Sequence, residues 1–391
     1  MRIAATSPAI PPHSSAQQQQ AGEALKAYWT MKAHSLIRRI FRSKRKRSNL
    51  RLTMVMKNLR VAFSALILLS ATSCVIAQKR MPQLQMPKNG TQATVIRVAN
   101  LYVQADESAD RGAQVQPGRE LVVAERSGRW LRVFANTDAP ESRKADQPVM
   151  EDNQQPVPVS GWMIDKGVID TKTPNGDQIL FGEAVSAENA AIEPHPPPGA
   201  ALEARLLYRR VVEMFPQSSL VPEAMWRAAD VRWQLQKADA AQLPSAHEKE
   251  NYLREQMDED EMRKIEKYFP HTKWADFAAY DIIENKICGD WQGSEKCPEK
   301  ETDIYMKYVE EHPDSPRAAE ALYLASWRMA AAGDMWAADG NEGRAKEDRA
   351  HSQEIAGRLQ TKFPQSVYAS RAADLVYKMQ QGIAIYGSDR E

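Results

Sequence analysis

The chain has 391 residues, of which 43% are hydrophobic and 26% are charged, a balance typical of a soluble globular protein. Its formal net charge is +1 at pH 7, but basic residues concentrate before residue 56 and acidic residues between 248 and 314. Since loss of the basic N-terminal part would leave an acidic protein, the charge distribution argues against a nucleic-acid partner. About 300 residues after the N-terminal segments predict two domains.

Residues 1–55 combine a Pro-, Ser- and Gln-rich opening with a basic block at residues 38–51. Such a segment cannot bury enough apolar surface to fold, so we expect disorder here. The basic block is also compatible with a nuclear address or a nucleic-acid arm. Because the next segment indicates export, those interpretations conflict with it. We therefore expect residues 1–55 to lie upstream of the true start, Met56 or Met54.

Residues 56–77 have the layout of an export signal. Two basic residues are followed by an apolar run, residues 61–71, that is too short to span a bilayer, and small residues precede Cys74. The segment resembles the signal of bacterial lipoproteins, which implies that Cys74 carries the lipid. Several acyl chains would attach the protein stably to a membrane. Plain secretion after cleavage at Ala77 and an uncleaved anchor are the alternatives.

Residues 78–90 are polar, contain prolines and lack any period, which predicts a tether. From residue 91 onward, short β-branched and aromatic runs alternate with turn residues, which predicts short strands. Many short strands with frequent turns favour a small all-β barrel or sandwich over residues 91–170. The predicted strands are residues 91–98, 101–103, 120–124 and 130–134.

This region resembles the bacterial Src-homology-3-like domain in the order of five phrases, residues 95–98, 101–104, 117–123, 128–133 and 161–163. The resemblance implies a small barrel that binds cell-wall peptides through an aromatic groove, with Trp130 and Trp162 as candidate ligand contacts. We favour the interpretation that both are core residues, because a small barrel must bury its large side chains. The polar, proline-rich residues 136–159 predict a long mobile loop.

Residues 171–199 predict a linker between two domains. Pro194 and the three prolines at 196–198 cannot join a sheet ladder and favour stiff, extended chain. Such a linker would hold the domains apart. Residues 179–184 could still pack as a last strand against the barrel.

Beyond residue 200 the apolar pattern becomes helical, and one phrase recurs four times. Each copy follows an amphipathic helix and precedes an alanine-rich one. Proline moves the residue before it out of helical geometry, and the Ser or Thr two positions later can cap the next helix. The alanines allow close helix contact, so stacked pairs bury a continuous apolar face. The copies are Phe215-Pro216-Gln217-Ser218, Phe269-Pro270-His271-Thr272, His312-Pro313-Asp314-Ser315 and Phe363-Pro364-Gln365-Ser366.

These helix pairs resemble the tetratricopeptide repeat, in the variant with Phe-Pro-x-Ser turns found in outer-membrane assembly and cell-division lipoproteins of Gram-negative bacteria. The resemblance covers residues 200–382 and implies an all-α helical-repeat solenoid, with residues 383–391 as a tail. Spacing between copies is longer than in the family because of insertions. We interpret the tryptophans of these helices as core residues rather than ligand contacts: Trp226, Trp233, Trp274 and Trp327.

Cys288 and Cys297 are the cysteines that remain if lipid or cleavage consumes Cys74. Export would place both in an oxidising compartment, and their spacing suits a loop between helices, so we predict a disulfide. A metal site is the alternative, but two thiols with no nearby histidine supply too few ligands.

Common catalytic motifs are missing from the sequence, including the nucleophile elbow, the phosphate-binding loop and the zinc-peptidase motif. Cys288 with His312 or His351 would be the candidate peptidase pair, but Cys288 follows a predicted helix rather than beginning one. We therefore predict a non-catalytic adaptor without cofactor or metal. The resemblances imply that it binds envelope proteins or peptidoglycan, lipid-anchored in the periplasm or at the outer membrane of a Gram-negative bacterium. A cell-wall hydrolase or its subunit is the alternative.

Overall fold

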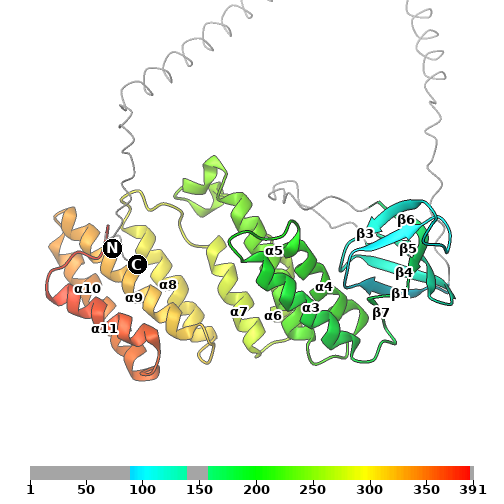
Figure 1. The fold of residues 1–391 in the computed structure, drawn as a ribbon. Helices are drawn as coiled ribbons and strands as arrows, with labels where there is room; N and C mark the ends of the chain where they lie inside the picture. The colour runs from blue at the N-terminus through cyan, green and yellow to red at the C-terminus, as the bar shows by residue number, and fades with distance from the viewer. Residues whose placement is uncertain (1–88, 139–156, 388–391) are drawn as a thin grey trace, which may run out of the picture. The chain divides into compact units, whose positions relative to one another are not determined.

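The computed structural model describes residues 89–138 and 157–387, which belong to one compact unit, Leu84–Glu391. A β part is followed in sequence by an α part (Figure 1). The predicted export signal, Cys74 and most of the predicted tether lie outside the described residues, as do residues 139–156 of the predicted loop. Within the described ranges, none of the helices combines the length and apolar character that a membrane span needs.

The β part is one antiparallel sheet of seven strands in the order β3-β2-β6-β5-β4-β1-β7. Its core comes from alternate positions, as on β5, where Leu131, Val133 and Ala135 are fully buried. The strands are β1 Thr91–Val95, β2 Ala99–Tyr102, β3 Arg111–Val115, β4 Glu120–Ser127, β5 Trp130–Ala135, β6 Val159–Ile164 and β7 Val168–Asp170.

A β domain over residues 91–170 is thus confirmed, but its sheet does not close into a barrel. The strand order is open, with β3 at one edge and β7 at the other. Strand β7 has three residues, and the chain then turns at Asp170, whose backbone N–H donates to Thr173 Oγ1 at 3.0 Å. The chain leaves the sheet at this turn, and β7 pairs with β1 alone among the described strands.

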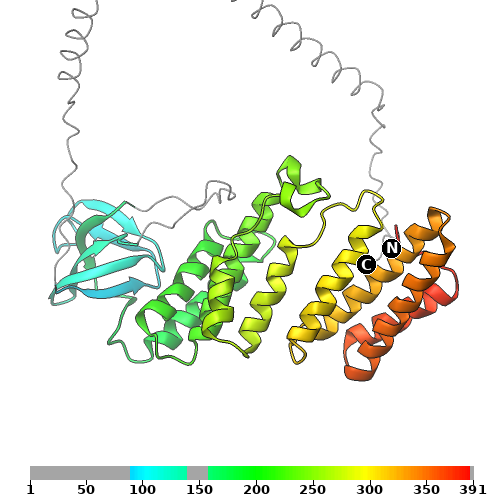
Figure 2. The same ribbon diagram turned by 180° about the vertical axis from the view of Figure 1, so that it is seen from behind.

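The α part consists of helices that pack mainly against their neighbours in sequence (Figures 1 and 2). Its α-helices are α3 Gly176–Ala191, α4 Ala200–Met214, α5 Val221–Ala240, α6 Asp260–Tyr268, α7 Lys273–Asp281, α8 Lys296–Glu311, α9 Ala318–Ala338, α10 Glu342–Lys362 and α11 Val367–Gln380. Three short 3₁₀ helices, η1 Pro244–His247, η2 Asn251–Leu253 and η3 Ile282–Asn285, lie between them.

The recurring phrase ends a helix in each of its four copies. The residue before each turn proline caps the preceding helix with a φ of −127° or −128°, although it is phenylalanine three times and histidine once. Thr272 and Ser366 then cap the next helix, as predicted. Ser218 and Ser315 do not: they accept the backbone N–H groups of Leu220 and Arg317, which precede α5 and α9. Alanines of the second helices, such as Ala278 and Ala321, are fully buried where helices meet.

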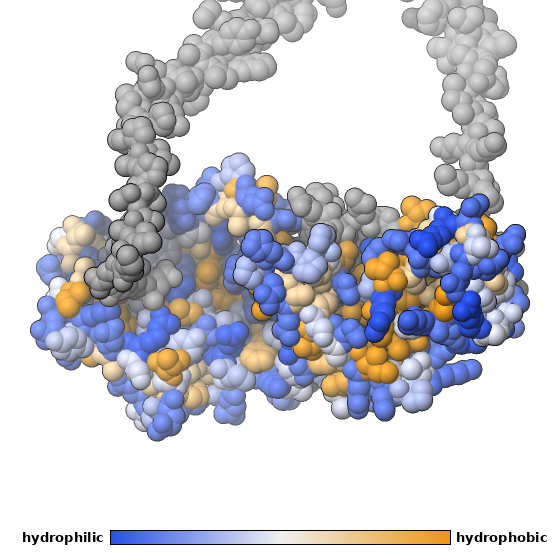
Figure 3. Space-filling model, viewed as in Figure 1, coloured by the Kyte–Doolittle hydropathy of each residue, from blue (hydrophilic) through white to orange (hydrophobic). Residues whose placement is uncertain are grey.

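The predicted linker at residues 171–199 is wrong, because most of it is helix α3 rather than extended chain or a last strand. Leu180, Ala184 and Ala187 recur at helical spacing and are buried against α4. The prolines lie after α3 and only shape its connection to α4. Ile169 of β7 belongs to the same apolar cluster, and hydrophobic residues gather where the sheet meets the helices (Figure 3).

Candidate functional site

Trp130 on β5 and Trp162 on β6 lie on the face of the sheet opposite its core. Each directly precedes a fully buried core residue, Leu131 and Met163 respectively, so its own side chain points the other way. Trp130 is only 8% exposed, because its ring packs edge-on against Tyr102 with 5.5 Å between ring centroids. Trp162 is half-buried.

Arginines cover part of this aromatic pair. The guanidinium carbon of Arg129 lies 5.8 Å from the Trp130 ring centroid, and that of Arg111 lies 6.0 Å from the Tyr102 ring centroid. The structure therefore brings both predicted residues to one face of the sheet and buries Trp130 there. A role for Trp130 or Trp162 in ligand binding stays a prediction.

A second cluster of aromatic and acidic side chains lies on α5 and α7, and we call it the acidic–aromatic face: Trp226 and Asp230 of α5 with Trp274, Phe277 and Asp281 of α7. All five are half-buried. The Trp226 ring stacks on Trp274 with 5.4 Å between centroids and lies 5.0 Å from Phe277. Trp226 Nε1 donates to Asp281 Oδ2 at 3.2 Å.

The two carboxyl groups of this face are held in a poorly hydrated place. Burial, and to a lesser extent the nearby charge of Asp230, raises the pKa of Asp281 to about 7. Burial likewise raises the pKa of Asp230 above its ordinary value. Their hydrogen-bond donors are neutral, since Asp230 accepts from Gln234 Nε2 at 3.0 Å and Asp281 from the Trp226 indole. The nearby charge of Arg317 lowers the pKa of both carboxyl groups, but the effect of burial is larger.

Cations of the chain itself already contact these rings. Lys273 Nζ lies 4.3 Å from the Trp274 ring centroid, and the Arg317 guanidinium carbon lies 5.8 Å from that of Phe277. Arg317 also pairs with Glu320 at 2.7 Å. The chemistry of this face, electron-rich rings beside carboxylates, thus suits ammonium and guanidinium groups.

The predicted disulfide partners are adjacent in space. The sulfur atoms of Cys288 and Cys297 lie 2.15 Å apart, at bonding distance, and both residues are buried. The loop between them is pressed onto the chain near Glu248, because a Cβ added at Gly289 would lie 2.1 Å from the Glu248 carbonyl oxygen. His312 is engaged elsewhere, with its Nδ1 2.8 Å from Asp276 Oδ1. Within the described ranges, His, Cys, Asp and Glu side chains form no group that could hold a metal ion.

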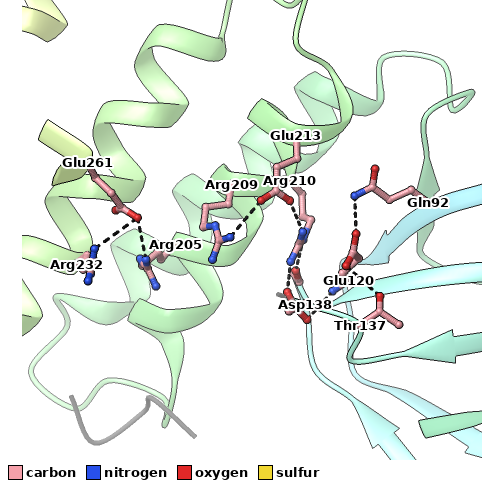
Figure 4. A network of polar contacts seen from close by, with 11 residues as sticks. Gln92, Glu120, Thr137, Asp138, Arg205, Arg209, Arg210, Glu213, Arg232 and Glu261 are labelled. Atoms are coloured by element: carbon pink, nitrogen blue, oxygen red, sulfur yellow. Dashed lines mark hydrogen bonds and ion pairs between the residues drawn. The ribbon is translucent and has the colours of Figure 1, made fainter. Parts of the chain in front are cut away.

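A buried arginine joins the sheet to α4 (Figure 4). Arg210 is 2% exposed, donates from Nε to the Gly118 carbonyl oxygen at 2.8 Å and pairs with Asp138 and Glu213. Gly118 has φ +74°, and a Cβ there would lie 2.7 Å from Leu206 Cβ, so glycine permits the close approach. This cluster connects the β part to α4. It includes no residue of α5 or α7, which carry the acidic–aromatic face.

Sequence reasoning missed the acidic–aromatic face because it assigned Trp226 and Trp274 to the core. A local signal was present: Asp230 follows Trp226 by four positions, and Asp281 follows Trp274 by seven, so each pair shares one side of its helix. No protein-family model matches the chain, and no curated protein matches it in sequence.

Proposed function

We propose that the protein is a non-catalytic adaptor of the bacterial cell envelope that binds a lysine- or arginine-bearing segment of a partner protein through the acidic–aromatic face. The observation that carries this proposal is the pair Asp230 and Asp281, half-buried beside stacked rings and raised in pKa. A cation placed between these carboxyls would offset their repulsion and face the rings, so the site is poised to bind one.

The proposal also includes a fold type for each part of the chain. We infer a Src-homology-3-like β part and a tetratricopeptide-like α part. The five sequence phrases support the first. The common backbone geometry at residues 215, 269, 312 and 363 supports the second, because a structural repeat should reuse its turn.

Export and lipid attachment at Cys74 are proposed from the sequence of residues 56–77. In this proposal the protein is lipid-anchored in the periplasm or at the outer membrane of a Gram-negative bacterium, where envelope proteins or peptidoglycan are accessible. Support comes from Cys288 and Cys297, since paired cysteines at bonding distance are typical of oxidising compartments.

Peptide mass spectrometry of unreduced protein from bacterial membranes tests the export proposal. We expect an acylated Cys74 as the N-terminal residue, together with a peptide in which Cys288 and Cys297 are cross-linked. An unmodified N-terminus at Gln78 would indicate secretion without lipid. Free thiols at both Cys288 and Cys297 would contradict export itself.

Fluorescence anisotropy with labelled decapeptides tests the partner chemistry. Lysine- and arginine-rich peptides should bind more tightly than glutamate-rich peptides of equal length. The double variant Asp230→Asn/Asp281→Asn should weaken binding about tenfold or more, because loss of roughly 1.4 kcal/mol corresponds to that factor. A matched control is Asp374→Asn, which removes an acidic charge that is 58% exposed on α11.

Three outcomes would overturn the assignment. Equal weakening by the Asp374→Asn control would show a diffuse charge effect rather than a site on α5 and α7. Unchanged binding by the double variant would place recognition elsewhere. If cationic peptides do not bind but isolated peptidoglycan still pulls the protein down, the wall rather than a protein is the partner.

A further inference from the structure

The end of the described chain, which lies in the predicted tail at residues 383–391, folds back onto the helices. Helix α11 ends at Gln380, and Gly382 with φ +68° turns the chain, whose Ile383 N–H donates to the Lys378 carbonyl oxygen at 2.9 Å. Ile385 is then only 3% exposed, although it belongs to no helix or strand. Residues 388–391 lie outside the described residues.

The side chain of Ile385 enters an apolar cluster formed by two helices. Ala330 of α9 and Leu375 of α11 are the buried members, and Trp327 and Met379 pack against them. The neighbours of Ile385 in sequence stay open, since Ile383 is 49% exposed and Tyr386 is 40% exposed. One aliphatic side chain therefore provides the apolar part of the contact.

A single carboxylate binds the backbone of this segment. Asp334 Oδ2 accepts the backbone N–H groups of Ile385 at 2.6 Å and Tyr386 at 3.2 Å. Asp334 Oδ1 is held by Arg349 Nη2 at 2.9 Å, which orients the carboxylate. Recognition through main-chain groups does not depend on the side chains of the bound segment, as in known modes of peptide binding.

The loop between Cys288 and Cys297 provides the third group of contacts to the C-terminal segment. Trp291 lies within that loop and stacks on Tyr386 with 6.0 Å between ring centroids and 13° between ring planes. Trp291 also contacts Trp327, with 5.7 Å between centroids, and donates from Nε1 to Glu301 Oε1 at 2.9 Å. Its ring is thus fixed by contacts that do not need Tyr386.

We propose that Asp334, Trp291 and the apolar cluster of α9 and α11 form a peptide-binding site that the chain's own C-terminal segment occupies as an exchangeable ligand. Its partner is an extended segment with an aliphatic residue followed by an aromatic one. The aliphatic residue fills the cluster, the two backbone N–H groups bind Asp334 and the aromatic ring stacks on Trp291. This site lies apart from the acidic–aromatic face and does not rest on the function proposed above.

Peptide exchange in the full-length protein tests the proposal. The probe is a fluorescein-labelled peptide of residues 381–391, and the variant Ile385→Ser weakens the internal segment. We expect the variant to bind the probe at least tenfold more tightly than the native protein, because its own segment competes less. Adding Asp334→Asn should remove this binding. The control Ile383→Ser, at an exposed neighbour, should behave like the native protein.

Failure of the Ile385→Ser protein to bind the probe, with its fold intact by circular dichroism, would show that the segment is a fixed part of the fold. Binding that persists after Asp334→Asn would refute the assigned site. If Ile385→Ser does not fold, native-state hydrogen exchange decides the matter. The amides of residues 385 and 386 should then exchange far faster than those of α11, and equal protection would overturn the proposal.

Discussion

Replacing Arg210 with methionine is expected to destabilise the protein by about 3–5 kcal/mol, measured by urea unfolding. Asp138 and Glu213 would lose the cation that compensates them, and Asp138 is almost fully buried, with only 6% of its side chain exposed. The Gly118 carbonyl oxygen would lose its donor as well. The cost arises from the charges left behind rather than from the favourable energy of the ion pairs.

Arg209 provides a matched control for Arg210. It is adjacent in sequence and pairs with the same Glu213 at 3.2 Å, but 26% of its side chain is exposed. Arg209→Met should therefore cost less than about 1 kcal/mol. The double variant Arg210→Met/Asp138→Asn should recover part of the loss, because it removes one uncompensated charge. Equal losses at both arginines, or no recovery, would contradict the assigned role of Arg210.

Replacing Asp281 with asparagine is expected to stabilise the protein at pH 8 but not at pH 4. The pKa of Asp281 is about 7 in the folded protein against an ordinary 3.8, so folding disfavours its ionised form. Stability is therefore lost as pH rises between these two values, and the full cost is present above pH 7. A shift of that size corresponds to on the order of 4 kcal/mol, and asparagine keeps an oxygen for the Trp226 indole.

Thermal unfolding at pH 4 and pH 8 measures this effect. A gain on the order of 2–4 kcal/mol at pH 8 is expected for Asp281→Asn, and less than about 0.5 kcal/mol for the exposed control Asp374→Asn. The same gain at both pH values would show that packing, rather than ionisation, accounts for it. A cationic peptide bound at the acidic–aromatic face should reduce the gain, since it favours the ionised carboxylate.

Local chemistry made some of the fold predictable. The turn phrases fix a backbone geometry through proline, so Phe215 and its counterparts could be located from the sequence alone. The short separation of Cys288 and Cys297 likewise allowed their pairing to be anticipated. Helix α3 was missed because the prolines after it predicted extended chain for the whole of residues 171–199. Leu180, Ala184 and Ala187 nevertheless recur at helical spacing in the sequence.

The contacts that matter for the candidate sites join residues far apart in sequence. Arg210 and Gly118 are separated by 92 positions, and Ile385 and Asp334 by 51. No local period encodes such pairs, because they depend on how the helices and the sheet pack. The interaction of Asp230 with Asp281 was unpredictable for the same reason, because the two residues lie on different helices, α5 and α7.

The four proline turns share one backbone geometry. The connections at the opposite ends of the helices differ from one another, so the helix stack has two unlike edges. Consecutive helices reverse direction, so the four proline turns come at one edge and the other connections come at the opposite one. The second edge carries the insertion between α5 and α6, the disulfide loop and the returning C-terminal segment. Connecting loops tolerate insertions better than the helices that they join. New recognition can therefore evolve there by changing loops, while the proline edge preserves the spacing of the helices.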